Sequence, residues 1–438
     1  MKFVNKKLFF ISLVSLGLSL SSQASELPND TCSKYNVSTA RNVKHNRLQL
    51  GGYGEAVMSR MFYSDNWKRY TDASKYKNAP SYGRFDIPHA VIFMNYDFGQ
   101  GWTFGSEIEF EHGGNESAVE IEEEETGEYE NEIERGGEVG FEQLWLQKSF
   151  SPLLNLRAGH IVVPVGLTNQ GHLPTQFFSV LRPEGENTIL PCTWHETGIS
   201  LWGRSKHWKY EVQLLPGLDA DRFSNVNWIQ GGAGSPYEFK IATAYAGVLR
   251  IDNYSVKGLR LGLSGYVGNS ASNSLKHDNY AGVKGTVSIG TFDFEYNAHN
   301  WIARGNFDYG HLSNSDKISA VNKNLSAYSV SPRTNVGSDA LATAVEVGYD
   351  VFSQVDKMKD KQKFYVFGRY DYYDSMYKTA GGILKEQEWG RQRIAGGINY
   401  YPIKDIVVKA EYSSRLFKKQ YNNENTFSIG IAYAGFFL

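Results

Sequence analysis

The stretch that decides the fold is FEQLWLQKSF at 141–150, followed directly by SPLLNLRAGHIVV at 151–163. Both segments show strand pattern, and they meet at a Ser-Pro pair, which indicates a hairpin with a tight turn. Strand pattern resumes only at 197–203, after a loop of roughly thirty residues. A loop of that length is usually functional or disordered, and its aromatic content argues against disorder. We therefore expect this loop, residues 164–196, to fold inward and narrow a channel.

The composition of the chain suits strands that have one wet face and one apolar face. Aromatic residues make up 14% of the 438 residues, with 28 Tyr, 25 Phe and 44 Gly, and helical patterns are scarce. Mainly large apolar residues alternate with polar or small residues along 102–111 and again along 341–351. In a water-soluble sandwich the apolar face would meet a second sheet, whereas in a membrane barrel it would meet lipid.

The number and spacing of the strands decide between these two folds. The turns between successive strands are alternately short and long, as in outer-membrane barrels, which carry short turns at one rim and long loops at the other. A sandwich has no reason to sort its loops in this way. The sequence therefore predicts an all-β, transmembrane antiparallel β-barrel of about 16 strands, in which loop 164–196 is the third external loop. The predicted strands are 48–62, 84–98, 102–112, 138–150, 153–163, 197–203, 207–215, 239–250, 257–268, 280–289, 291–303, 340–352, 363–374, 389–401, 404–415 and 426–438.

The N-terminus has the pattern of a secretory signal peptide. Three lysines precede the apolar run Leu8–Leu20, and small residues follow it, with a cut expected after Ala24. An uncleaved anchor is the alternative. We expect residues 1–24 to be removed, 25–47 to form a periplasmic segment and 48–438 to form the barrel in the cell outer membrane. The net charge of -2 becomes more negative by three, so nothing in the charge points to nucleic acid.

Several segments together resemble the phosphate-selective porin O and P family of bacterial outer-membrane proteins. They are RFDIPHAVIFMNYDFGQGWTFGSEIEFEHGG (84–114), FEQLWLQKSF (141–150), LRAGHIVVPVGLTN (156–169), RPEGENTILPCTWHETGISLWG (182–203) and PGLDADRF (216–223). The resemblance implies a sixteen-stranded homotrimeric porin whose third external loop enters the lumen. It also implies basic residues that line the pore and bind phosphate.

The side chains predicted to face the lumen carry both signs of charge, and the two signs nearly cancel. Arg391 and Arg393 either form a cationic stripe with neighbouring strands or pair with Asp371 and Glu411. The residues predicted to line the constriction are His172, Phe177, Phe178, Arg182, Glu184, Trp194, His195 and Glu196. The charged residues predicted to line the wall are Glu107, Glu109, Arg157, Arg260, Lys284, Glu346, Arg369, Asp371, Arg391, Arg393, Lys409, Glu411 and Arg415.

Other motifs carry less weight. Cys32 and Cys192 either pair in an oxidising compartment or remain separate thiols. Ten glutamates lie in 116–134 and are read as a solvated loop tip, with a divalent cation bridging to lipopolysaccharide as the alternative. The sequence shows no nucleophile motif and no metal-ligand spacing, so we expect no catalysis, no metal and no cofactor.

The predicted function is a porin, a passive diffusion channel for small hydrophilic solutes and ions. One alternative is a channel specific for phosphate, pyrophosphate or another small anion, and another is a structural or adhesive barrel plugged by its loops. The predicted partners are outer-membrane lipid, lipopolysaccharide and the permeating solutes.

Overall fold

The computed structural model describes residues 47–112, 118–121, 133–136, 139–234, 239–274, 277–325, 329–359 and 361–438. The predicted signal peptide, nearly all of the predicted periplasmic segment, Cys32 and most of the glutamate-rich stretch lie outside these residues. The strands are β1 (Leu48–Met61), β2 (Tyr82–Asp86), β3 (His89–Gly99), β4 (Trp102–Glu111), β5 (Ala118–Ile121), β6 (Ile133–Gly136), β7 (Val139–Ser151), β8 (Leu154–Val162), β9 (His195–Arg204), β10 (Trp208–Pro216), β11 (Tyr245–Asn253), β12 (Leu259–Asn269), β13 (Thr286–Ala298), β14 (Trp301–Leu312), β15 (Asp339–Asp350), β16 (Lys363–Lys378), β17 (Gly390–Ile403), β18 (Ile406–Leu416) and β19 (Glu424–Phe436).

These strands form a closed antiparallel barrel with sixteen strand positions, as the sequence predicts. β2 and β3 both pair with β1 and together count as one barrel strand, which is interrupted at Ile87 and Pro88. Proline has no amide hydrogen, so the ladder cannot continue through it. β5 and β6 form a separate two-stranded sheet that is not part of the barrel sheet.

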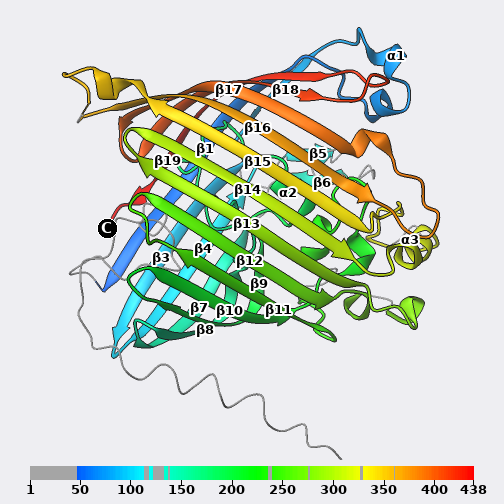
Figure 1. The fold of residues 1–438 in the computed structure, drawn as a ribbon, viewed down its shortest axis with the longest axis horizontal. Helices are drawn as coiled ribbons and strands as arrows, with labels where there is room; N and C mark the ends of the chain where they lie inside the picture. Colours follow the sequence, from blue (N-terminus) through cyan, green and yellow to red (C-terminus); the bar gives the residue numbers. More distant parts are fainter. Residues whose placement is uncertain are drawn as a thin grey trace, which may run out of the picture. The chain divides into compact units, whose positions relative to one another are not determined.

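The two ends of the described chain close the barrel. β1 pairs with β19 from Gly51 opposite Phe436 to Met61 opposite Thr426. Closure leaves no strand edge with unpaired amides and carbonyls, which is what a sheet needs within a hydrocarbon layer. Figure 1 shows the slanted strands, with α1 (Ala73–Tyr76) and α3 (Ser315–Lys323) at one rim.

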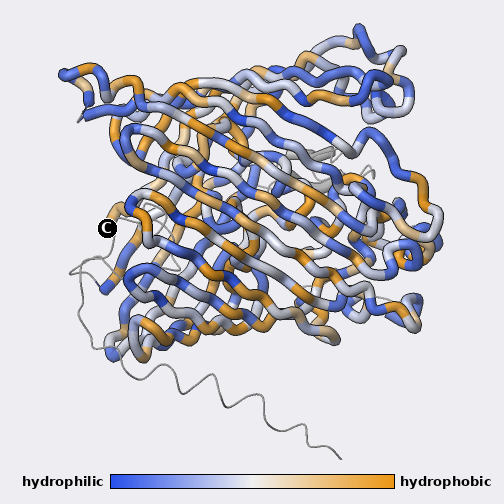
Figure 2. The backbone as a smooth tube through the Cα atoms, viewed as in Figure 1, coloured by the Kyte–Doolittle hydropathy of each residue, from blue (hydrophilic) through white to orange (hydrophobic). Residues whose placement is uncertain are grey.

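Each barrel strand places apolar and polar residues on opposite faces. In β11 the outward Leu249 and Ile251 are exposed, whereas the inward Arg250 and Asp252 are buried. Figure 2 shows the same alternation as orange and blue segments along the strands. The outward apolar face includes Val212, Leu214, Leu263, Phe292, Phe307, Val345, Val366, Ile394, Val408, Ile429 and Ile431.

One pair of predicted strands is wrong. The sequence places a turn at Gly290, but β13 continues through this glycine and turns at His299 and Asn300. Both residues have positive φ angles, 54° and 66°, as a two-residue hairpin of the tight primed type requires. Asparagine tolerates this conformation without glycine, so the turn carries no glycine signal.

The connections sort into two rims, as predicted. Loops of eleven or more residues follow β1, β4, β8, β10, β12, β14 and β16, whereas most turns at the other rim have two to five residues. Short helices occur mainly in the long loops, including α2 (Glu186–Ile189). Within the described residues, no helix is long and apolar enough to cross a membrane.

Candidate channel lumen

The loop between β8 and β9, residues 163–194, crosses the lumen and is fastened to the opposite wall. Lys409 on β18 donates through Nζ to the carbonyls of Phe177 (2.9 Å) and Ser179 (2.8 Å). Glu411 Oε2 accepts from the Val180 amide at 3.0 Å. Here this segment is called the constriction loop. Its backbone is held by charged groups that would otherwise be free to attract ions.

The constriction loop is also tied to the wall near β11 and β12. The carbonyl of Gly166 accepts from Arg250 Nη1 at 2.9 Å, and its amide donates to Ser264 Oγ at 3.0 Å. Gly166 has a φ of 81°, and a Cβ there would overlap the Glu186 carboxylate. A glycine is therefore required where the loop turns inward.

A belt of alternating charges lines the wall from β11 to β19. Arg250 contacts Asp252 at 2.8 Å and Asp293 at 3.0 Å, so its charge is shared between two carboxylates. The same pattern continues along the belt. Its further pairs are Arg260 with Asp293, Arg304 with Glu346 (2.5 Å), Arg369 with Asp371 (2.6 Å), Arg393 with Glu411 (2.5 Å) and Arg415 with Glu424 (2.9 Å).

The surroundings of Arg393 bear on the two alternatives left open by the sequence, a cationic stripe or paired charges. This residue bonds to Glu411 on the next strand and lies 3.3 Å from Glu184 of the constriction loop. Arg391 instead lies over the rings of Trp389 and Tyr70, at 4.8 Å and 5.6 Å. The arrangement favours pairing over an open cationic stripe.

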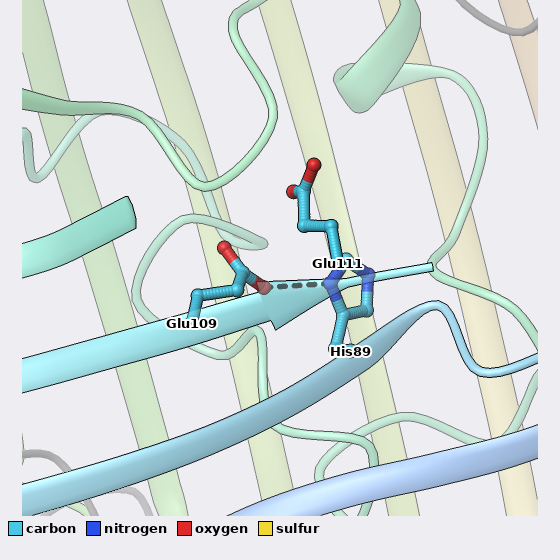
Figure 3. A group of neighbouring side chains, drawn as sticks. All are labelled: His89, Glu109 and Glu111. Atoms are coloured by element: carbon cyan, nitrogen blue, oxygen red, sulfur yellow. Dashed lines mark hydrogen bonds and ion pairs between the residues drawn. The ribbon is translucent and has the colours of Figure 1, made fainter. Parts of the chain in front are cut away.

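The wall formed by β1, β3, β4 and β7 has the opposite character. Glu107, Glu109 and Glu142 are all buried there, and Arg182 of the constriction loop approaches Glu142 and Glu109 only to 3.8 Å and 4.0 Å. His89 Nδ1 lies 2.7 Å from Glu109 Oε1. Figure 3 shows His89 and Glu109 facing each other, with Glu111 beside them. We call this side of the barrel, with His89, Glu107, Glu109, Glu111 and Glu142, the acidic wall.

The structure places most predicted site residues inside the barrel. Three of them lie in a different element from the one predicted. His195 and Glu196 belong to β9 rather than to the loop, because β9 begins two residues earlier and pairs them with Val162 and Ile161. Lys284 is exposed in the loop before β13, since that strand begins later than predicted.

The remaining predicted residues fall into distinct settings. His172, Phe177, Phe178 and Trp194 are buried, with Trp194 packed on Tyr266 at 5.0 Å near the base of the loop. Arg157 lies between the rings of Trp145 (4.7 Å) and Trp202 (5.7 Å). Arg182, Glu184, Arg260, Glu346, Arg369, Asp371, Lys409, Glu411 and Arg415 make the ion pairs and hydrogen bonds given in this section. Cys192 is half-buried, and since Cys32 lies outside the described residues, a disulfide and two separate thiols both stay open as predicted alternatives.

Sequence reasoning missed a second segment inside the barrel. Residues 217–234, which follow β10, bury Phe223, Trp228 and Ile229 in the same apolar cluster as Trp194 of the constriction loop. Trp228 Nε1 donates to the carbonyl of Gly337 at 3.1 Å. Like the constriction loop, this segment contains aromatic residues, and the same reasoning could have predicted that it folds inward.

Comparison with known proteins supports the fold. No protein-family profile matches the sequence. An uncharacterized protein of Aquifex aeolicus is 26% identical over 386 residues, covering 86% of this chain and 78% of that protein. OmpF of Salmonella typhi, solved with daunomycin, superposes with a TM-score of 0.52 at 12% identity, covering 89% of this chain and 97% of that one.

Two further solved structures have the same architecture. An anion-selective porin from Comamonas acidovorans superposes with a TM-score of 0.50 at 10% identity, covering 89% of this chain and 99% of that one. OprB of Pseudomonas putida superposes with a TM-score of 0.50 at 9% identity, covering 89% and 94%. The chain therefore has the closed sixteen-stranded barrel fold of outer-membrane porins.

Proposed function

We propose that this chain is an outer-membrane porin, a passive diffusion channel for small hydrophilic solutes and ions. The observation that carries the proposal is the division of the barrel into two faces. Its outward face presents large apolar side chains on successive strands, and its inward face carries buried charged residues around the constriction loop. The apolar outward face is suited to contact with acyl chains, and the charged lumen is suited to hydrated solutes.

The way the charges are paired bears on which solutes pass. A phosphate-specific channel, as the family resemblance implies, needs basic groups that are available to the anion. Here Arg250, Arg369 and Arg393 each share their charge with carboxylates. The carboxylates of the acidic wall have fewer basic partners than those of the belt. We therefore propose a general channel with a mild preference for cations, and the homotrimer implied by the resemblance remains part of the proposal.

A barrel plugged by its loops is the second candidate. Its support is the shared apolar cluster of the constriction loop and residues 217–234, which includes Leu190, Trp194 and Trp228. Such packing stabilises the loops in one arrangement.

Reconstitution of the full-length protein in planar lipid bilayers tests these functions. A porin gives stepwise current increases, and in a KCl gradient the reversal potential should indicate a modest cation preference. Addition of phosphate should leave the chloride current unchanged. A silent membrane in the presence of correctly folded protein would contradict the proposal and favour the plugged barrel. Anion preference with block by phosphate would favour the phosphate channel.

A further inference from the structure

Three buried side chains from separate parts of the chain come together at the acidic wall. Glu107 lies on β4, Glu142 on β7 and His172 on the constriction loop. One donor atom from each lies within 4.8 Å of the other two, and all three residues are buried. The grouping depends on the constriction loop, because the inward path of this loop brings His172 to Glu107 and Glu142.

His172 is oriented as a histidine ligand would be. Its Nδ1 lies 3.0 Å from the carbonyl oxygen of Asn169, and since a carbonyl only accepts, Nδ1 carries the hydrogen. The other ring nitrogen, Nε2, then holds the lone pair. That atom is buried and has no hydrogen-bond partner within the described part of the chain. Metal-bound histidines typically have their second nitrogen fixed in this way by a carbonyl or carboxylate.

The two carboxylates are also held by neighbours. Glu142 Oε2 accepts from the Tyr53 hydroxyl at 2.7 Å, and Glu107 Oε2 accepts from Gln143 Nε2 at 2.6 Å. Glu142 Oε1 is buried and accepts no hydrogen bond from any residue that the structure describes. Tyr53 also packs its ring against His172, with centroids 5.9 Å apart. Neighbouring side chains thus hold both carboxylates in place, with one oxygen of each within 4.8 Å of the other and of a His172 ring nitrogen.

The charge around this cluster is out of balance. Glu107, Glu109 and Glu142 bring three carboxylates into a buried region, whereas the one guanidinium of Arg182 forms long ion pairs with two of them, 3.8 Å from Glu142 Oε1 and 4.0 Å from Glu109 Oε1. Buried charges are costly unless they are paired or coordinate a metal. A bound cation would supply the missing positive charge.

We propose that Glu107, Glu142 and His172 bind a divalent first-row transition-metal ion such as Zn²⁺. Donors around one such ion, at about 2.0 to 2.2 Å each, lie at most about 4.4 Å apart, so small side-chain rotations complete the site. An imidazole nitrogen suits zinc, iron or nickel, whereas Ca²⁺ and Mg²⁺ take oxygen ligands. The sequence predicts no metal because these ligands are far apart in the chain.

The acidic wall also offers a way to the site. Glu107, Glu109 and Glu111 alternate along β4, and β4 ends toward the rim that carries the long loops. His89, Glu109 and Glu111 likewise bring their donor atoms within 4.8 Å of one another (Figure 3). Carboxylates in series lower the barrier to cation entry, as charged rings do in cation channels. The metal site goes beyond the proposed function and does not depend on conduction.

The test uses full-length protein purified in detergent and freed of metal with a chelator. Zn²⁺ binding is measured by titration calorimetry, and Co²⁺ serves as an optical probe of the coordination geometry. The variants are Glu142→Gln and His172→Gln. Glu295→Gln is the matched control, since Glu295 is a lumen-facing carboxylate of β13 next to Arg260 in the belt. Heat-modifiable electrophoretic mobility confirms that each variant is folded.

We expect one equivalent of Zn²⁺ in the original protein and in Glu295→Gln. Each ligand variant should bind at least about tenfold more weakly and lose the Co²⁺ visible bands. Absence of stoichiometric binding, or equal affinity in a folded Glu142→Gln variant, would overturn the site. Because binding is measured without a membrane, a barrel that binds Zn²⁺ but carries no current would refute the proposed channel and retain the site.

Discussion

Glu184 is the residue through which the constriction loop meets the belt most directly. Its carboxylate accepts from Arg415 Nη2 at 2.8 Å and from the Tyr373 hydroxyl at 2.5 Å, and Arg393 lies 3.3 Å away. Burial alone would raise the pKa of Glu184, but Arg393 and Arg415 hold it well below the ordinary glutamate value of 4.5. The carboxylate is therefore ionised over the whole physiological range.

This depressed pKa gives a stability contribution with a defined sign. The native state binds its Glu184 proton more weakly than the unfolded chain, so the contribution is present at neutral pH and is lost as the pH falls. We expect Glu184→Gln to lower the free energy of unfolding by about 1.5 to 3 kcal/mol at pH 7. The difference from the original protein should stay constant from pH 8 to about pH 5 and shrink below that.

Urea unfolding in detergent micelles over this pH range measures the difference. Tyr373→Phe is a useful comparison, because it removes one hydrogen bond to Glu184 and leaves the two arginines in place. A difference between the original protein and Glu184→Gln that disappears between pH 8 and pH 5 would show that the carboxylate is not held by these arginines.

At the same scale, single residues mark where sequence reasoning reached its limit. Strand alternation predicts that Arg369, Arg393 and Lys409 face inward, and the structure has all three buried, because the period of two is strict along well-defined strands. It misses Arg304 and misplaces Lys284, since both depend on the position of the turn between β13 and β14. His172 was assigned to the constriction loop, but no pattern in a single sequence could bring it to Glu142.

At the scale of elements, the constriction loop is positioned by ring packing as well as by charge. Phe178 stacks on Phe367 of β16, with centroids 5.4 Å apart and planes 13° from parallel. Its ring lies directly over Gly348 of β15, where any Cβ would overlap it. Gly348 thus provides the space in the wall that the loop occupies.

We expect Gly348→Ala to push Phe178 off the wall and to lower the free energy of unfolding by about 1 to 3 kcal/mol, the usual cost of overpacking. The matched control is Gly368→Ala on the neighbouring β16, because Gly368 faces outward and a Cβ there meets nothing within 4 Å. Limited proteolysis of the constriction loop and urea unfolding report the two effects. Equal behaviour of the two variants would show that the loop does not rest on this glycine.

The elements themselves differ in how far sequence could predict them. The hairpin of β7 and β8 was predicted because both strands are long, alternate clearly and meet at a Ser-Pro pair. The inward packing of residues 217–234 was not, although Phe223 and Trp228 are as apolar as residues of the constriction loop. A loop's destination depends on the cavity that the other strands create, and that cavity exists only after closure.

At the scale of the whole molecule, the outward apolar face makes sense only if acyl chains cover it. Large apolar side chains are exposed on strands from β3 to β19, and in water an exposed surface of this extent would drive aggregation. The inward face, by contrast, carries charged side chains, which are ion-paired along the belt. The two faces together specify a membrane barrel, which is why the fold was accessible from sequence while the solute was not.

A pair of lysine substitutions tests this placement. Leu263 lies near the middle of β12 and is 62% exposed on the outward face, whereas Val256 is 58% exposed in the turn between β11 and β12. The two side chains are thus equally accessible, but only Leu263 is expected to lie in hydrocarbon. Leu263→Lys should lower the unfolding free energy in lipid vesicles by about 2 to 4 kcal/mol, the cost of lysine near the bilayer midplane, and Val256→Lys should change it by less than about 1 kcal/mol. If urea unfolding gave the same small effect for both, the outward face would lie in water, and the channel proposed for this barrel would fail with it.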